Sequence, residues 1–189
     1  MTQAQAGGRR SAHRFGVPSR YAAKALLCLA YLAALPASAD TTAPIELAVF
    51  DFEFEDFSAG ASTRRTPSDT EHLARVTEEV RHLLVRSGRY RLVDVSDTEV
   101  AAAKARTLRH CDGCDAAIAL SLGAEQSFVG VVRRITRTEY QVRFQIRDTR
   151  TGAVVADENS GLRMGADYSW SRGAVRLIEE RLLENPPQQ

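Results

Sequence analysis

Cysteine is scarce in this 189-residue chain, which has only three, at positions 28, 111 and 114. Long apolar runs are absent too: the run at residues 25–35 spans 11 residues, and a membrane-spanning helix needs about 20. We therefore expect no stable membrane insertion. The chain also has no Gly-x-Ser-x-Gly elbow, P-loop, dinucleotide fingerprint or His-Glu-x-x-His pair. These absences predict that the protein is not an enzyme and needs no cofactor.

The N-terminus has the layout of a secretory signal peptide. Five basic residues precede the apolar run, and the small residues Ala37 and Ala39 offer a signal-peptidase site before Asp40. Cys28 lies inside the run behind a leucine, where a lipoprotein signal needs a small residue. We predict a cleaved signal peptide over 1–39, a single domain over 40–189, and a periplasmic or secreted product.

Cleavage near Ala39 changes the charge of the protein. The whole chain has a formal charge of +1, but 20 Lys and Arg stand against 24 Asp and Glu once the five basic residues of the leader are removed, a charge of −4. A mildly acidic protein has no basic excess to neutralise phosphates. We therefore expect no nucleic-acid partner.

The first half of the mature chain predicts the order strand, helix, strand, helix. In the first strand, over 45–56, the even apolar positions are expected to share one face; they are Ala48, Phe50, Phe52 and Phe54. Ser68 and Glu71 are spaced as a capping box for a helix that Gly88 closes. A short strand over 90–95, a helix over 97–106 and a short helix over 115–122 follow.

The second half changes to a period of two. Strands are expected over 128–136 and 140–147, followed by a turn at 148–152, a third antiparallel strand over 153–158 and a helix from Ser169. Trp170 shares an apolar helical face, which favours core packing over a binding platform. We predict an α/β two-layer sandwich: a mixed sheet of about five strands, ending in an antiparallel meander, with helices mainly on one face.

Several segments resemble known periplasmic domains. They are Leu47-Ala-Val-Phe-Asp-Phe52, Tyr90-Arg-Leu-Val-Asp94, Leu122-Gly-Ala-Glu-Gln-Ser-Phe-Val-Gly130 and Ile146-Arg-Asp-Thr-Arg-Thr-Gly-Ala-Val154. Together they resemble the domain shared by TolB N-terminal regions, curli-secretion CsgG and penicillin-binding-protein activator lipoproteins. Cys111-Asp-Gly-Cys-Asp115 and Ser169-Trp-Ser-Arg-Gly173 are similar to an uncharacterised family of secreted bacterial proteins, a domain of unknown function. The resemblance implies a non-catalytic module that docks other envelope proteins. The chain lacks the lipoprotein cysteine and the TolB propeller, so neither partner set is carried over.

One segment, residues 110–115, contains residue types that could carry chemistry. In an oxidising compartment, Cys111 and Cys114 are expected to form a disulfide that pins a turn. One alternative is a redox dithiol for thiol-disulfide exchange, although the neighbouring carboxylates oppose a thiolate. The other is a metal site made of His110, both cysteines and Asp115, which lacks a second Cys or His pair.

Two groups of polar residues lie on predicted strands. The wet face of the strand over 140–147 is expected to bind a partner through Gln141, Arg143, Gln145 and Arg147. The acidic residues of the first strand are interpreted as partners of arginines on neighbouring strands, such as Arg133, Arg143 or Arg147. The sequence therefore predicts an envelope interaction module, with thiol or metal handling at Cys111 and Cys114 as the alternative.

Overall fold

The computed structural model describes residues 43–58, 66–96, 107–161, 163–165 and 169–184. All of these residues belong to one compact unit, residues 42–189. The predicted signal peptide and the predicted helix over 97–106 lie outside the described residues.

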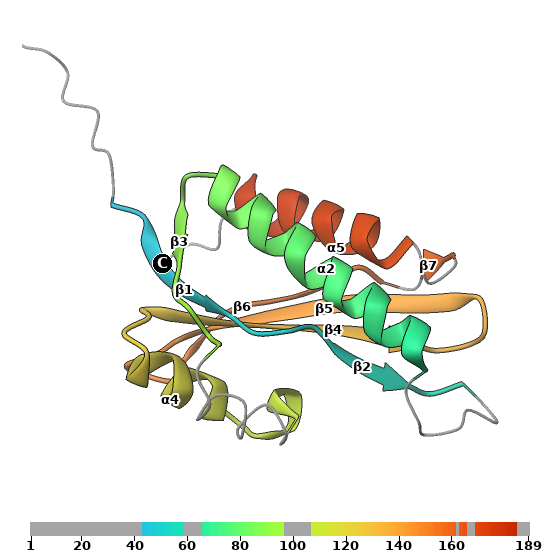
Figure 1. The fold of residues 1–189 in the computed structure, drawn as a ribbon, viewed down its shortest axis with the longest axis horizontal. Coiled ribbons are helices and arrows are strands. Elements are labelled where there is room, and N and C mark those ends of the chain that lie inside the picture. The colour runs from blue at the N-terminus through green and yellow to red at the C-terminus, as the bar shows by residue number, and fades with distance from the viewer. Residues whose placement is uncertain (1–42, 59–65, 97–106, 162, 166–168, 185–189) are drawn as a thin grey trace, which may run out of the picture. The chain divides into compact units, whose positions relative to one another are not determined.

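A mixed sheet forms the centre of this unit (Figure 1). Its strands are β1 (Ile45–Val49), β2 (Glu53–Asp56), β3 (Tyr90–Leu92), β4 (Gln126–Arg134), β5 (Glu139–Asp148), β6 (Val154–Asn159) and β7 (Arg163–Met164). The order across the sheet is β3-β1-β4-β5-β6; β2 also pairs with β4, and β7 also pairs with β5. Pairs among β1 to β4 are parallel, and the β4, β5 and β6 pairs are antiparallel. The predicted mixed α/β sheet ending in a meander is confirmed.

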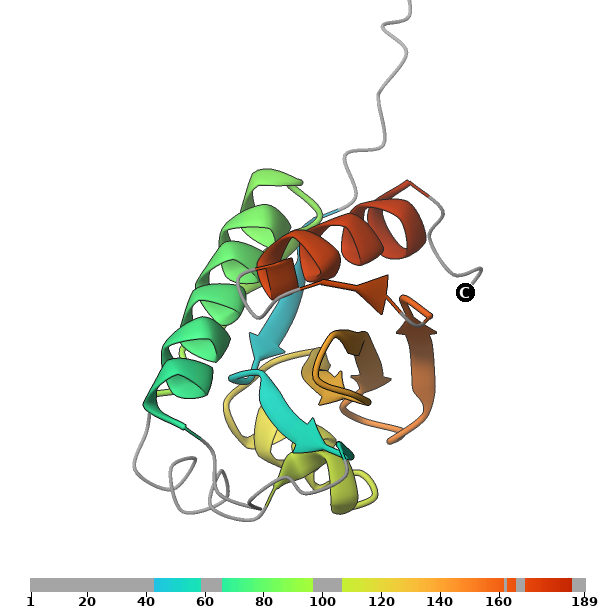
Figure 2. The same cartoon turned by 90° about the vertical axis from the view of Figure 1, so that its right-hand side faces the viewer.

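The helices divide unequally between the two faces of the sheet (Figures 1 and 2). The longer helices α2 (Pro67–Arg86) and α5 (Trp170–Ile178) pack on one face over the larger core, and a π-helical turn, Glu179–Leu183, follows α5. The short α4 (Cys114–Ser121) and the 3₁₀ turn Leu108–His110 lie over a smaller core on the opposite face. We call this opposite side of the sheet the second face. It includes the part covered by α4 and the part beyond α4, where polar side chains of the sheet are exposed.

A one-residue bulge separates β1 from β2, which pair with the same side of β4. Val49 pairs with Phe128 and Glu53 pairs with Val131, so four steps along the first strand match three along β4. An extra residue of this kind reverses which face each following side chain occupies. Residues 50–52 therefore form a switch point within the first strand.

The bulge makes one of our predictions wrong. Phe50 packs in the smaller core, as does Ala48, whereas Phe52 and Phe54 pack with the larger core, so the even positions do not share a face. The backbone N–H of Phe52 donates to Thr77 Oγ1 of α2 at 3.0 Å instead of joining the ladder. A Cβ at position 130 would overlap the Phe52 ring, which explains why glycine stands in β4 at that point.

The first turn of α2 also differs from the prediction. The capping box is formed by Thr66 and Asp69: Thr66 Oγ1 accepts from the Asp69 N–H at 3.1 Å, and Asp69 Oδ2 accepts from the Thr66 N–H at 2.9 Å. Ser68 and Glu71 do not form it, because Pro67 begins the helix and leaves Thr66 extended at the N-cap. At the other end, Gly88 has a φ of +70°, as a residue that closes a helix does.

An arginine at the end of β4 joins α2, α5 and β2. The Arg134 guanidinium lies 4.8 Å from the Phe54 ring centroid and 5.5 Å from that of Trp170. It also pairs with Asp56 at 3.4 Å and with Asp69 at 2.9 Å. Trp170 is 1% exposed, which confirms its prediction as a core residue.

Candidate functional site

The wet face of β5 forms the polar part of the second face. The even residues from Tyr140 to Ile146 are buried, and the odd residues between them are partly exposed, as a half-buried strand requires. The structure thus places Gln141, Arg143, Gln145 and Arg147 on one surface. Whether a partner binds there stays a prediction.

Cross-strand contacts to β6 hold three of these side chains. Arg143 Nε donates to Asp157 Oδ1 at 2.7 Å, and its Nη2 donates to the other oxygen. Gln145 donates to the same carboxylate at 3.3 Å, and Gln141 donates to Asn159 Oδ1 at 3.2 Å. The hydrogen bonds from Arg143 lower the pKa of Asp157, although partial burial opposes this shift. The carboxylate therefore stays charged at neutral pH, and β5 and β6 present fixed groups of both signs.

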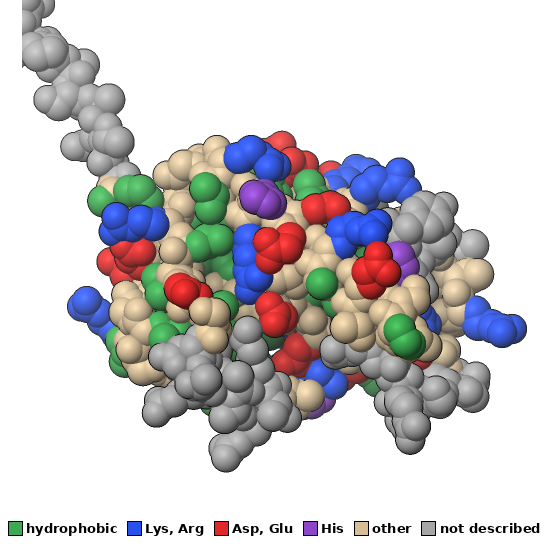
Figure 3. Space-filling model, viewed as in Figure 1, with side chains coloured by type: hydrophobic (Ala, Val, Ile, Leu, Met, Phe, Trp, Pro, Cys, Tyr) green, Lys and Arg blue, Asp and Glu red, His purple; other side chains and the backbone are tan. Residues whose placement is uncertain are grey.

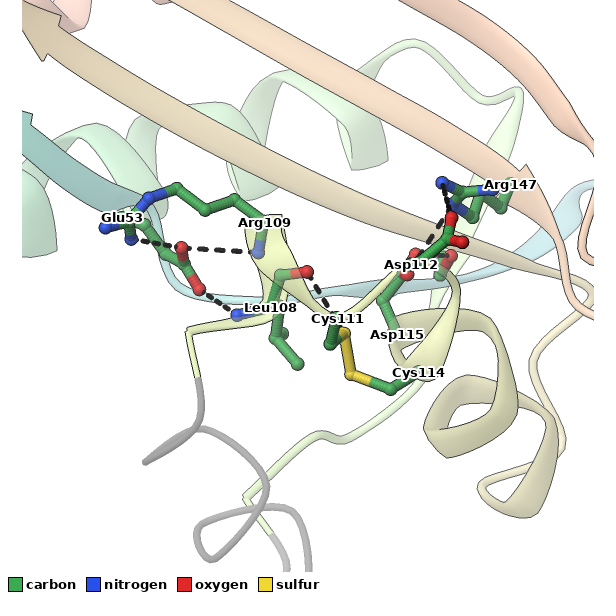
Figure 4. The surroundings of a disulfide bond; sticks show 9 residues. Glu53, Leu108, Arg109, Cys111, Asp112, Cys114, Asp115 and Arg147 are labelled. Atoms are coloured by element: carbon green, nitrogen blue, oxygen red, sulfur yellow. Dashed lines mark hydrogen bonds and ion pairs between the residues drawn. A yellow bond between two sulfur atoms is a disulfide. The ribbon is translucent and has the colours of Figure 1, made fainter.

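Arg147 connects β5 to α4 (Figure 4). Its Nη1 donates to the Gly152 carbonyl at 3.0 Å, and its Nε lies 3.7 Å from Asp115 Oδ1. Asp115 is 3% exposed and accepts from the buried Ser127 hydroxyl at 2.6 Å. These contacts hold the start of α4 against the sheet, so part of the second face is covered.

The acidic side chains of β2 lie against the 3₁₀ turn. Glu53 accepts from the Leu108 N–H and, at 2.6 Å, from Arg109 Nη1. Glu55 accepts from Arg133 Nε at 2.7 Å and lies 3.5 Å from Arg109 Nε. The predicted pairing of these acids with strand arginines is confirmed for Arg133.

The other two arginines that the prediction named as examples form ion pairs with different carboxylates. Arg143 pairs with Asp157, and Arg147 pairs with Asp112 and Asp115. The residue that the sequence reasoning missed is Arg109, which reaches Glu53 across 56 positions of sequence because the bulge turns that carboxylate toward the second face.

Cys111 and Cys114 are bonded through their sulfurs, with their Cα atoms 5.5 Å apart (Figure 4). Between them, Asp112 and Gly113 have φ values of 40° and 98°, and the Cys114 N–H donates to the Cys111 carbonyl at 3.3 Å. Two consecutive positive φ values are typical of a type I′ turn, for which Asp-Gly is a preferred pair. The dipeptide was the sequence signal for this geometry. Thiol exchange at the pair stays a prediction.

The structure does not bring the four residues of the alternative metal site together. The two sulfurs are bonded to each other, Asp115 contacts Ser127, and the His110 ring lies 3.7 Å from Glu55. Within the described ranges, no group of three or more His, Cys, Asp or Glu side chains is arranged to hold a metal ion.

A cavity of about 210 Å³ lies between the cystine turn and the sheet. Its floor is apolar, from Leu108, Val129 and Val131, and three arginines line it: Arg109, Arg143 and Arg147. Gln145 and the turn residues complete the lining. Two of the arginines belong to the predicted partner-binding set, which therefore borders a hollow rather than a flat sheet.

On the face that Figure 3 shows, charges of both signs are mixed. In the view of Figure 3, basic and acidic side chains alternate, and neither sign gathers in a broad patch. Among the described helices, none is both long enough and apolar enough to span a membrane.

Comparison with solved structures finds several that are similar to this chain at low sequence identity. The C-terminal domain of LpoB from Salmonella enterica is 17% identical, with a TM-score of 0.47 over 67% of this chain and 87% of that one. The PelC dodecamer from Paraburkholderia phytofirmans is 18% identical (TM-score 0.44; 77% and 90%), and TolB from Acinetobacter baumannii is 14% identical (TM-score 0.40; 72% and 28%). The predicted resemblance to TolB-like domains is confirmed, but similarity at this level carries no argument about function.

Residues 45–182 match the model of the family described as "Protein of unknown function (DUF2380)", and the chain belongs to this family. The predicted membership of an uncharacterised family is thus confirmed. No curated protein matches the chain.

Proposed function

We propose that the protein is a non-catalytic, exported interaction module of the cell envelope, and that it binds a protein partner through the polar part of the second face. The observation that supports this proposal is the row of fixed, partly exposed groups on β5 and β6. Asp157 holds Arg143 and the Gln145 amide across the strands, and Asn159 holds the Gln141 amide. Binding residues on a rigid sheet need little ordering when a partner docks, which limits the entropic cost of association.

The mixed signs of these groups favour a protein surface as the partner. Arginine and amide side chains offer donors, and the Asp157 carboxylate offers an acceptor beside them. Such a pattern gives specificity through complementary charges on the other protein. A polyanion such as nucleic acid would be repelled by Asp157 and by the acidic charge of the mature chain.

A photo-crosslinking residue at position 141 tests this proposal in the native envelope. We expect Gln141 replaced in this way to give a discrete adduct with another protein, and we expect the additional change Arg143→Glu to abolish the adduct, because the reversed charge repels the group that Arg143 binds. Adducts are read by denaturing electrophoresis and mass spectrometry of the excised band.

The matched control places the crosslinker at Glu79, an exposed position on α2 at the opposite side of the sheet. It should give no such adduct. The same adduct from both positions, or one from position 141 that persists with Arg143→Glu, would refute binding through this surface.

Export is the other part of the proposal, supported by the Ala37-Ser-Ala39 site. We expect the protein recovered from the envelope fraction to begin at Asp40 and to be lighter by two hydrogens than the chain with free thiols at Cys111 and Cys114. Intact-mass analysis before and after reduction measures both. An uncleaved or acylated chain would contradict export by signal-peptide cleavage, and an unchanged mass on reduction would contradict the disulfide.

A further inference from the structure

The outer edge of the sheet, formed by β6, has backbone groups that β5 does not use. Within the described part of the chain, β6 pairs with β5 alone and is the last strand in the order of the sheet (Figure 2). The Ser160 N–H donates to the Val142 carbonyl at 2.8 Å, which fixes the alternation of the ladder. The N–H and C=O groups of Asp157 and Asn159 therefore point away from β5, where an added strand would bond them.

A charged side chain on this edge limits which segment can be added. Glu158 stands opposite Phe144, on the side of the sheet that carries the larger core, and it is half-buried. No hydrogen bond or ion pair joins Glu158 to another described residue. An inward-pointing charge protects an edge strand from indiscriminate pairing. A segment that pairs with β6 must therefore place a cation opposite this carboxylate.

A cavity of about 730 Å³ adjoins the same edge on the side of the larger core. Val155 and Ala156 of β6 line it together with Ile146 and Leu182, and charged side chains contribute to the rest of its lining. In an added antiparallel strand, the residue opposite Ala156 follows the one opposite Glu158 by two positions and lies on the same face. An apolar side chain at that position extends the apolar part of this lining.

We propose that an extended segment of a partner protein adds to β6 as an antiparallel strand, with a lysine or arginine opposite Glu158 and an apolar residue two positions later, opposite Ala156. The inference rests on the proposed function, because Asp157 and Asn159 belong both to this edge and to the polar part of the second face. A second copy of this chain fits less well, since its own β6 would bring the same two acids and like charges on paired strands are destabilising. In strand addition, backbone hydrogen bonds give affinity and alternate side chains give specificity.

The test titrates the exported protein with the peptide Ac-Thr-Lys-Thr-Val-Thr-NH2, which can place its lysine opposite Glu158 and its valine opposite Ala156. NMR follows the backbone amides of β6 and their hydrogen exchange. We expect the amides of Asp157 and Asn159 to shift and to exchange more slowly, because they gain carbonyl acceptors on the peptide. Exchange at Ser160 should change little, because its N–H already donates to β5.

Two N-methylated peptides distinguish strand addition from other modes of binding. The N–H of the central threonine points toward β6 in the proposed register, and the N–H of the lysine points away from it. Methylation of the threonine nitrogen should therefore weaken binding about tenfold, whereas methylation of the lysine nitrogen should leave it within twofold. Equal weakening by the two methyl groups would contradict the proposed strand.

An exchange of charges assigns the lysine to Glu158. Glu158→Lys should weaken binding of the lysine peptide about tenfold, and a peptide with glutamate in place of lysine should regain most of the affinity for this variant. The control Glu79→Lys makes the same change at an exposed position on α2 and should leave the affinity within twofold.

Three results would overturn the inference: no binding of the lysine peptide, full binding of that peptide to Glu158→Lys, or slow exchange of Asp157 and Asn159 in concentrated protein without peptide. The last result would show that a second copy occupies the edge. If the position-141 adduct persists when the peptide test fails, only the added strand is refuted. If the adduct is also absent, the proposed function fails with it.

Discussion

Replacing Phe144 by aspartate is expected to leave the domain unfolded where the wild type is folded. Phe144 is 1% exposed in the middle of β5, and its ring stacks on Phe128 with 5.4 Å between centroids. The variant loses this packing and buries a carboxylate without a partner, at a cost of several kcal/mol. Domains of this size have a total stability of about 5–15 kcal/mol, so the loss removes most of it. Circular dichroism and thermal melting measure the outcome.

Arg143→Ala is the matched control, one residue away on the same strand. It removes a partly exposed ion pair with Asp157, which is worth about 0–1 kcal/mol. Its melting temperature should therefore stay close to that of the wild type. If both variants lost the same stability, the faces of β5 would be assigned incorrectly.

The contrast between Phe144 and Arg143 also shows which features of the fold could be predicted from the sequence. Strict alternation along β5 predicted its inner and outer faces correctly, because apolar residues on a half-buried strand recur at every second position. The buried faces of α2 and α5 could likewise be predicted from the spacing of apolar residues within each helix. Elements whose burial repeats with their own period can be recognised without knowledge of their neighbours.

The first strand shows where local patterns fail. Four aromatic and small residues at even positions fit one face, yet the bulge at 50–52 moves Phe52 across the sheet. The bulge depends on Thr77 in α2 and on the space above Gly130 in β4, which are far away in the sequence. No pattern within the strand contains that information.

The same reason limits what could be predicted of the site. The set on β5 came from alternation, but the cavity is also lined by Leu108 and Arg109, which Glu53 holds once the bulge has turned its carboxylate toward them. Arg109 could not be assigned to a face from a repeating pattern, because it lies in a three-residue turn ahead of a short helix. Asp112-Gly113 was the local signal that could have indicated how the cystine turn bends over the sheet.

Replacing Arg134 by alanine is expected to cost about 3 kcal/mol at neutral pH, the second-largest effect. The guanidinium lies against the rings of Phe54 and Trp170 and pairs with Asp69, whose carboxylate is almost completely buried. Its loss removes the contacts with these two rings, on β2 and α5, and leaves a buried charge without its cation. Arg134→Lys should restore only part of the stability, because an ammonium cannot stack as a planar group or reach Asp56 and Asp69 with two nitrogens. Denaturant unfolding measures all three proteins.

The pH dependence separates the ion pair from the packing in this prediction. Burial raises the pKa of Asp69, but hydrogen bonds from Thr66 and Arg134 outweigh it and hold the pKa below the ordinary value of 3.8. A lowered folded-state pKa stabilises the protein above the unfolded value, and this stability is lost as the pH falls through the folded value. The difference between wild type and Arg134→Ala should therefore shrink as the pH falls from about 4 through the lowered pKa of Asp69, and below that pKa only the loss of ring contacts remains. A difference that stays constant from neutral to acidic pH would show that Arg134 acts through packing and that Asp69 does not depend on it.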